Sequence, residues 1–244
     1  MRRRTEADVK VIRRALNEAL ATLVVSLVAI GCGSGDTARG DGGGGGGGSP
    51  PALGCEADAP ASSTLSCVLW FEPGPGAGHG QDDFPRIIEG EPTGIDDRHQ
   101  SLDVLSLGRG GEIAFGFGGN EIVDGEGADF VIFENPFLFG ASGAVFAEPG
   151  EVSVSEDGEA WTTFPCAADA YPFTGCAGWH PVLANADNGL PPDDPALAGG
   201  DAFDLAEVGM TRARFIRIRD VSNYGGAPQA GFDLDAARII HAAR

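Results

Sequence analysis

The sequence has little positive charge and lacks the motifs of the common enzyme classes. Only 16 of its 244 residues are lysine or arginine, against 36 acidic residues, and the formal net charge is −20. Such a surface repels phosphate backbones, so nucleic acids are not expected partners, whereas solubility, divalent cations or basic partners suit it. The patterns HExxH, GxSxG and GxxxxGK do not occur. No enzyme activity is therefore expected, although a carboxylate pair such as Glu134 and Asp233 is of the type that glycosidases use.

Long helical patterns are also scarce after the N-terminal segment, while glycine (39) and proline (16) are abundant. Several short segments instead alternate apolar and polar side chains, which is typical of half-buried strands, and Asp157-Gly158 is typical of a hairpin turn. The segment 130–133 is apolar on both faces and predicts a central strand. Strands are predicted at 102–107, 112–117, 130–133, 152–155, 161–164, 214–219 and 236–241. Short strands separated by turn signals favour an all-β sandwich, in which the polar connection from Trp179 to Asp204 is unusually long.

The N-terminal segment is typical of an export signal. A basic stretch precedes the uncharged run 21–30, which is too short to span a bilayer comfortably. The run leads to Ala29-Ile30-Gly31-Cys32, which resembles the lipobox of bacterial lipoproteins and implies that Cys32 is acylated. An ordinary secretory signal is the alternative. Removal of residues 1–31, which carry a net charge of +3, leaves a chain of charge −23.

A glycine-rich segment follows Cys32 and contains an uninterrupted glycine run at 42–48. Such a composition cannot build a core, and it predicts a flexible tether. The expected organisation is a signal peptide at 1–31, a lipid-anchored linker at 32–54 and a β-sandwich domain at 55–244. The expected location is the cell envelope, at the outer membrane or the cell surface, with the lipid as the only membrane contact.

Four cysteines remain in the predicted domain, at Cys55, Cys67, Cys166 and Cys176. An even number in an exported chain predicts disulfides, and three pairings are possible. Local pairing, Cys55 with Cys67 and Cys166 with Cys176, is preferred because each bond would close a short loop. Zinc ligation is disfavoured, since no CxxC spacing occurs and the histidines are scattered.

Five segments, in order, resemble a largely uncharacterised group of bacterial cell-surface proteins and lipoproteins. They are Ser101-Leu102-Asp103-Val104-Leu105-Ser106-Leu107-Gly108, Asp129-Phe130-Val131-Ile132-Phe133-Glu134-Asn135, Val152-Ser153-Val154-Ser155-Glu156-Asp157-Gly158, Gly200-Asp201-Ala202-Phe203-Asp204-Leu205-Ala206 and Gly231-Phe232-Asp233-Leu234-Asp235. The resemblance covers about residues 78–243. It implies a jelly-roll sandwich similar to discoidin and galactose-binding-like domains, without an established activity or catalytic residues.

Two acidic groupings are candidates for structural calcium, because hard cations bind several oxygen ligands on a rigid frame. One flanks the predicted central strand and comprises Asp124, Glu126, Asp129, Glu134 and Asn135. The other is Asp233 and Asp235, two residues apart and so on one face of a strand. Turn capping, or pairing of the last two aspartates with Arg214, Arg217 or Arg219, is the alternative.

Aromatic side chains on loops are candidates for ligand binding, since a ring face can stack on a sugar. Trp179 and His180, beside the long acidic connection, and Tyr224 are the candidates. The preferred function is a non-catalytic cell-surface binding module that recognises a glycan or a protein through loops at one end of the sandwich. The alternatives are an envelope structural or interaction protein without a small-molecule site and a secreted hydrolase.

Overall fold

Short antiparallel strands make up nearly all of the regular secondary structure in the described residues. The computed structural model describes residues 53–56, 58–141, 143–222 and 224–244, so the predicted signal peptide, Cys32 and the predicted linker up to residue 52 lie outside the described residues. The strands are β1 (Cys67–Glu72), β2 (Leu105–Ser106), β3 (Glu112–Gly116), β4 (Glu121–Val123), β5 (Phe130–Phe133), β6 (Phe137–Phe139), β7 (Ala144–Phe146), β8 (Gly150–Ser155), β9 (Thr162–Thr163), β10 (Asp201–Phe203), β11 (Arg212–Ala213), β12 (Phe215–Asp220), β13 (Gly225–Gly226), β14 (Gln229–Ala230), β15 (Asp233–Leu234), β16 (Ala236–Ile239) and β17 (Ala242–Ala243).

Helical structure is limited to single turns in the described part of the chain. These turns are α2 (Pro195–Ala198) and the 3-10 helices η2 (Gln81–Asp83), η3 (Arg86–Ile88) and η4 (Leu205–Val208). None of them has the length and hydropathy that a membrane-crossing helix needs.

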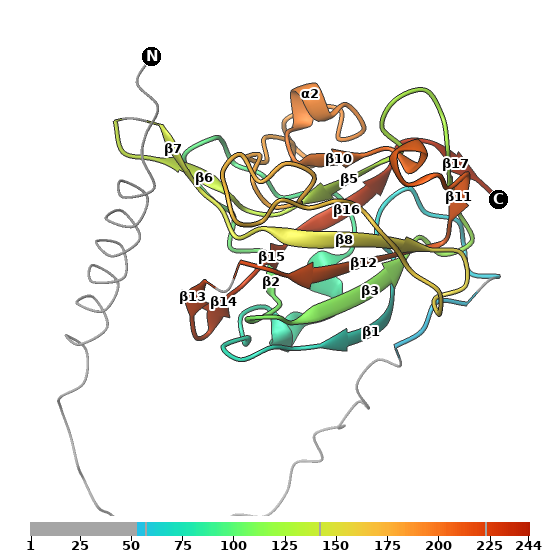
Figure 1. The fold of residues 1–244 in the computed structure, drawn as a ribbon, viewed down its shortest axis with the longest axis horizontal. Coiled ribbons are helices and arrows are strands. Elements are labelled where there is room, and N and C mark those ends of the chain that lie inside the picture. Colours follow the sequence, from blue (N-terminus) through green and yellow to red (C-terminus); the bar gives the residue numbers. More distant parts are fainter. Residues whose placement is uncertain (1–52, 57, 142, 223) are drawn as a thin grey trace, which may run out of the picture. The chain divides into compact units, whose positions relative to one another are not determined.

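The larger sheet has the order β1-β3-β12-β8-β9, with all neighbours antiparallel. Figure 1 shows β1, β3, β12 and β8 side by side. The two-residue period explains the register. In β12, Ile216 and Ile218 are fully buried, whereas Arg219 on the opposite face is exposed. Apolar side chains on one face of these strands therefore form one wall of the core.

The second wall consists of the sheet β10-β5-β16 and two smaller ladders, β15-β2 and β11-β4-β17. One hydrophobic cluster joins the walls: Phe115 and Ile216 from the larger sheet pack in it with Phe130, Ile132 and Phe203 from the second. Three rings, Phe130, Phe164 and Phe203, contact one another with centroids 5.0 to 5.9 Å apart. The all-β sandwich predicted from the sequence is confirmed.

The long connection after Trp179 covers the outer face of the second sheet. Val131 and Phe133 of β5 point away from the main core and pack in a second cluster with Val182, Ala184 and Ala198. Figure 1 shows α2 and its flanking loop next to β10 and β5. This cover explains why 130–133 is apolar on both faces, as the sequence predicts for a central strand.

The strands predicted by pattern are present: β5 has the predicted bounds, β8 begins two residues earlier, and β12 is shifted by one residue. Alternation placed β3, β8 and β12, and the hairpin predicted around Asp157-Gly158 joins β8 to β9. Gly158 has φ 80°, in the left-handed region that a turn of this kind needs. Within the predicted strand 102–107, only Leu105–Ser106 is a strand, and residues 102–104 are irregular chain.

The predicted local disulfide pairing is confirmed. Cys55 bonds to Cys67 and Cys166 bonds to Cys176. The first bond attaches the start of the described domain to β1. The second closes a surface loop whose far end, Ala177, pairs with Gly150 at the start of β8.

Replacing Cys166 and Cys176 together with serine should lower the free energy of unfolding by about 2–3 kcal/mol, because a short closed loop restricts the unfolded chain. For a domain of this size the expected drop in Tm is about 5–10 °C. Thermal unfolding of the double variant measures it. Peptide mapping without reductant should recover Cys55 linked to Cys67 and Cys166 linked to Cys176. A peptide joining Cys55 or Cys67 to Cys166 or Cys176 would contradict the pairing.

Candidate functional site

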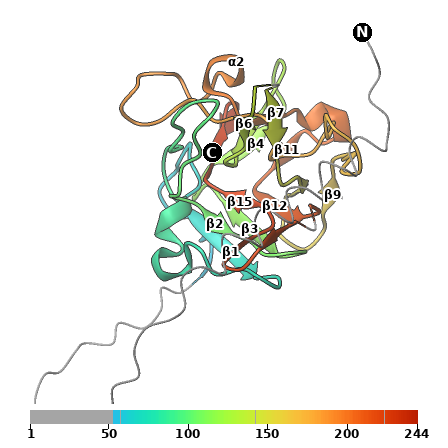
Figure 2. The same ribbon diagram turned by 90° about the vertical axis from the view of Figure 1, so that its left-hand side faces the viewer.

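Several strands meet at one end of the sandwich and bring buried acidic side chains with them. Strand β12 ends there at Asp220, which pairs with Gly150 at the start of β8. Strand β5 also ends there, where Ile132 pairs with Asp201 at the start of β10. This end is the left-hand side of Figure 1 and faces the viewer in Figure 2. The acidic residues buried at it are Glu134, Glu148, Asp201, Asp220, Asp233 and Asp235.

Three of these residues, Glu134, Glu148 and Asp233, form what we call the acidic cluster. Each offers a carboxylate oxygen, and these oxygens all lie within 4.8 Å of one another. Their exposed fractions are 2%, 3% and 5%. Glu134 directly follows β5, Glu148 comes shortly before β8, and Asp233 begins β15. Three distant chain segments therefore place like charges side by side, away from water.

The hydrogen bonds of the acidic cluster leave part of it unpaired. Ser106 Oγ donates to Asp233 Oδ1, and the Asp233 backbone N–H donates to Glu134 Oε1 over 3.3 Å. Glu134 Oε2 and Glu148 Oε1 are buried without a hydrogen-bond partner. None of the ion pairs among the described residues includes a member of the cluster.

Burial dominates the acid–base behaviour of the cluster. Burial, followed by the charges of Asp233 and Asp220, raises the pKa of Glu148 to about 9, against an opposing hydrogen bond from the Gly231 backbone N–H. Burial, followed by the charges of Asp233 and Glu148, raises the pKa of Glu134 well above its ordinary value. Burial also raises the pKa of Asp233 to about 6, against the opposing hydrogen bond from Ser106 and the charge of His79. Without a bound cation, burial therefore favours the protonated forms of Glu134 and Glu148.

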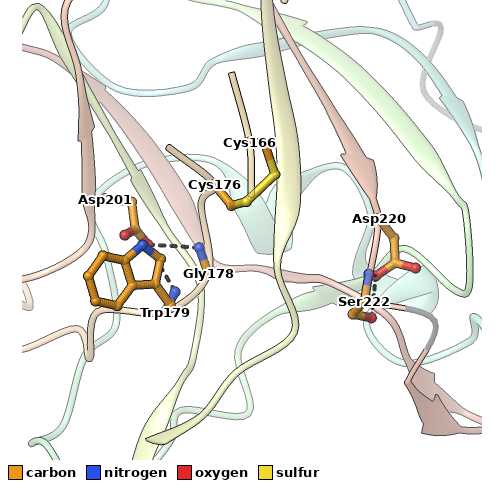
Figure 3. The surroundings of a disulfide bond; sticks show 7 residues. All are labelled: Cys166, Cys176, Gly178, Trp179, Asp201, Asp220 and Ser222. Carbon is orange, nitrogen blue, oxygen red and sulfur yellow. Dashed lines mark hydrogen bonds between the residues drawn. A yellow bond between two sulfur atoms is a disulfide. The ribbon is translucent and has the colours of Figure 1, made fainter. Parts of the chain in front are cut away.

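Asp201 and Asp220, also at this end, are fully bonded. Asp201 Oδ2 accepts the backbone N–H groups of Gly178 (2.7 Å) and Trp179 (3.1 Å) (Figure 3). Asp201 Oδ1 lies 2.7 Å from His180 Nδ1. Asp220 accepts from Ser222 and from the backbone N–H groups of Gly110 and Phe232. These two carboxylates are structural acceptors that hold loops in place.

Asn135 and Asp235, both predicted as metal ligands, have protein partners. Asp235 accepts from the Thr93 backbone N–H and hydroxyl, both over 2.9 Å to the nearer oxygen, and Asn135 Nδ2 donates to the Ser101 carbonyl. Both residues line, together with Glu134, a cavity of about 10 Å³. Such a volume holds about one water molecule.

The remaining predicted metal ligands, Asp124 and Asp129, lie beyond the opposite end of β5. They approach Asp204 closely enough to share an ion. However, Asp129 Oδ1 accepts from the Gly125 N–H and contacts His241 Nδ1, and Asp129 Oδ2 accepts from the Leu205 N–H. The first predicted grouping is thus divided, because the strand between Asp129 and Glu134 separates them by roughly 16 Å at about 3.3 Å per residue.

Trp179 and His180 belong to a cluster of rings at the surface, which we call the aromatic patch: Tyr171, Phe173, Trp179 and His180. The Trp179 ring lies 3.6 Å from the His180 ring and 6.1 Å, nearly perpendicular, from the Tyr171 ring. Phe173 lies 5.9 Å from Tyr171. Tyr171 is 62% exposed, and half of the His180 side chain is exposed.

The backbone under the aromatic patch is held from three sides. The Cys166–Cys176 disulfide precedes it, Ala177 pairs with Gly150, and Asp201 accepts the next two N–H groups (Figure 3). Gly178 has φ 86°, and a Cβ there would lie 2.8 Å from the Glu148 carbonyl oxygen. The segment that carries Trp179 therefore packs directly against the backbone of Glu148, a member of the acidic cluster.

Tyr224, the third predicted ligand-binding residue, joins other rings. Its ring contacts Phe146 of β7 at 5.5 Å, and Phe146 stacks on Phe137 of β6 at 5.2 Å. Tyr224 is half-buried. The structure therefore places Tyr224 in a packing contact with the β6–β7 hairpin and not in the aromatic patch.

Sequence reasoning missed Glu148 and Phe173, and it counted Tyr171 among the available aromatic residues without selecting it as a site residue. Glu148 lies between Ala147 and Pro149, outside any periodic segment, and its burial depends on chain segments far away. Tyr171 and Phe173 stand ten or fewer residues before Trp179, inside the loop that the predicted disulfide closes. An aromatic-rich loop closed by a disulfide was the available signal for these two residues.

In comparisons with known proteins, no family model and no curated protein matches this chain. The resemblance to bacterial cell-surface proteins stays a prediction.

With divalent cations removed by EDTA, stability should fall as the pH rises from about 5 to 9. The folded state keeps a proton on Glu148 up to a pKa of about 9, whereas the unfolded chain releases it near its ordinary 4.5. Between these values the folded state binds more protons, so raising the pH favours unfolding, by at most about 1.4 kcal/mol per pH unit for each such group. Urea unfolding of the full chain and of Glu148→Gln measures the slope. The variant should show a flatter profile, and identical profiles would contradict the assignment.

Proposed function

We propose that the domain is a carbohydrate-binding module and that the aromatic patch is its binding surface. The observation that carries the proposal is the exposed ring of Tyr171 beside Trp179 and His180, on a backbone fixed by a disulfide and by Asp201. The apolar C–H face of a sugar ring packs against an aromatic face, while polar ring atoms bind its hydroxyl groups. Rings held before the ligand arrives cost little entropy on binding.

Charge narrows the class of carbohydrate. The chain carries a net charge of −20, and the aromatic patch lies at the end of the sandwich where the buried carboxylates gather. Glycans with carboxylate, sulfate or phosphate groups would be repelled. The proposed ligand is therefore a neutral polysaccharide, with His180 as a hydrogen-bonding partner for its hydroxyl groups.

Binding without hydrolysis is supported by the burial of the acidic cluster. Glycosidase carboxylates flank the scissile bond of a bound sugar, about 5–9.5 Å apart. Glu134 and Asp233 are 2% and 5% exposed, and the cavity at Glu134 is about 10 Å³. A sugar ring does not reach them through such a space. With the predicted lipid anchor at Cys32, the module would attach a cell envelope to a neutral glycan outside it.

Binding of the full chain to an array of neutral polysaccharides tests the proposal. Tyr171→Ala and Trp179→Ala should each weaken binding to the best ligand at least tenfold. The Tyr171 variant is the more telling of the two, because its exposed side chain contributes little to folding. Isothermal titration with soluble oligosaccharides gives the affinities, and circular dichroism checks the fold.

Trp161→Ala is the matched control, because it removes an aromatic ring at the other end of β8, where the ring contacts Arg217 at 5.1 Å. Its binding should equal that of the parent chain. Binding that survives the loss of Tyr171, or an array without any bound neutral glycan, would contradict the proposal.

A further inference from the structure

We propose that Glu134, Glu148 and Asp233 form a binding site for one calcium ion. The inference is independent of the carbohydrate proposal, because it concerns buried oxygens and not the aromatic patch. Two groups of three acidic side chains among the described residues are close enough to share an ion, and of these two only this one consists of three buried carboxylates.

Spacing supports a shared ion. Calcium binds six to eight oxygens at about 2.4 Å, so two oxygens on the same ion lie at most about 4.8 Å apart. The oxygens offered by Glu134, Glu148 and Asp233 meet this limit. Three carboxylates supply up to six oxygens from one place, and the flexible geometry of calcium tolerates an irregular set better than the strict octahedron of magnesium does.

Unpaired oxygens point to a ligand independently of the spacing. Glu134 Oε2 and Glu148 Oε1 are buried and lack a hydrogen-bond partner, although their residues are only 2% and 3% exposed. Buried polar groups are nearly always bonded, and an unpaired carboxylate in an apolar surrounding is costly. Asp201 and Asp220, at the same end of the sandwich, show the usual state, with a hydrogen-bond partner on each of their oxygens.

The other acidic group, Asp124, Asp129 and Asp204, lacks this second observation. The carboxylate of Asp129 is occupied by the N–H groups of Gly125 and Leu205 and by His241. Asp204 accepts from the Ala206 N–H at the start of η4. These bonds make the group a set of turn and helix caps, and it serves below as the control.

A bound ion would link chain segments that are far apart in sequence. Glu134 follows β5 of one sheet, Glu148 precedes β8 of the other, and Asp233 lies in β15, which pairs with β2. The ion would thus join the two walls of the sandwich at the end where Glu148 supports the segment of Gly178 and Trp179. Removal of the ion should loosen that end first.

Calcium binding to the full chain tests the proposal directly. The protein is stripped with EDTA, dialysed against calcium chloride at pH 7.5, and examined by elemental analysis and isothermal titration. We expect one calcium per chain and, at a free calcium concentration of 100 times Kd, a rise in Tm of about 5–10 °C. Magnesium chloride at the same concentration should bind more weakly.

Calcium affinity should fall at least tenfold in each of the variants Glu134→Gln, Glu148→Gln and Asp233→Asn. Each of them replaces a charged carboxylate by a neutral amide of nearly the same shape. Asp204→Asn is the matched control: it also removes one acidic charge, asparagine still caps a helix, and calcium affinity should be unchanged.

Three outcomes would overturn the site. One is that the parent chain binds no calcium and that its Tm does not change with calcium. This outcome does not depend on the folding of any variant. The second is a rise in the Tm of Glu134→Gln or Glu148→Gln together with a parent chain whose Tm does not change with calcium, since the cluster would then bind protons and not an ion. The third is loss of binding in Asp204→Asn alone, which would place the ion at the other end of β5.

Discussion

The burial of acidic side chains at one end of the sandwich is the constraint on which the rest of the site depends. Carboxylates removed from water need N–H donors, protons or a cation. Asp201 and Asp220 take the first solution, and each of them fixes a loop in doing so. Glu134, Glu148 and Asp233 lack sufficient donors and face one another. The same end of the fold therefore contains two carboxylates that are fully hydrogen-bonded and a group of three that needs protons or a cation.

This arrangement connects the interior to the surface. The Glu148 carbonyl lies against Gly178, whose N–H is held by Asp201, and the next residue carries the ring of the aromatic patch. The proton or cation that neutralises Glu148 therefore binds to a residue whose backbone contacts Gly178, the residue before Trp179. The disulfide Cys166–Cys176 closes the loop from the other side, so the exposed rings stand on a backbone with few alternatives.

The fold was largely predictable, because strands of four or more residues leave a two-residue period in the sequence. Alternating side chains predicted β3, β8 and β12, and the apolar run of β5 predicted burial on both faces. Strands of two residues, such as β13 or β17, are too short to show a period and arise only from pairing. Trp179 and His180 could be predicted as surface aromatics, and Asp233 with Glu134 as a carboxylate pair. Glu148 could not, because nothing in its neighbours reveals that a distant β15 will bring Asp233 to it.

The connection that covers β5 has a consequence for the association of the protein with itself. Val131 and Phe133 would face water without Val182, Ala184 and Ala198 over them. The sequence Phe-Val-Ile-Phe combines high strand propensity with a complete lack of charge, the composition that promotes fibril-like association when it is uncovered. The loop thus separates this run from other chains, and removing the loop would expose Val131 and Phe133 and favour self-association.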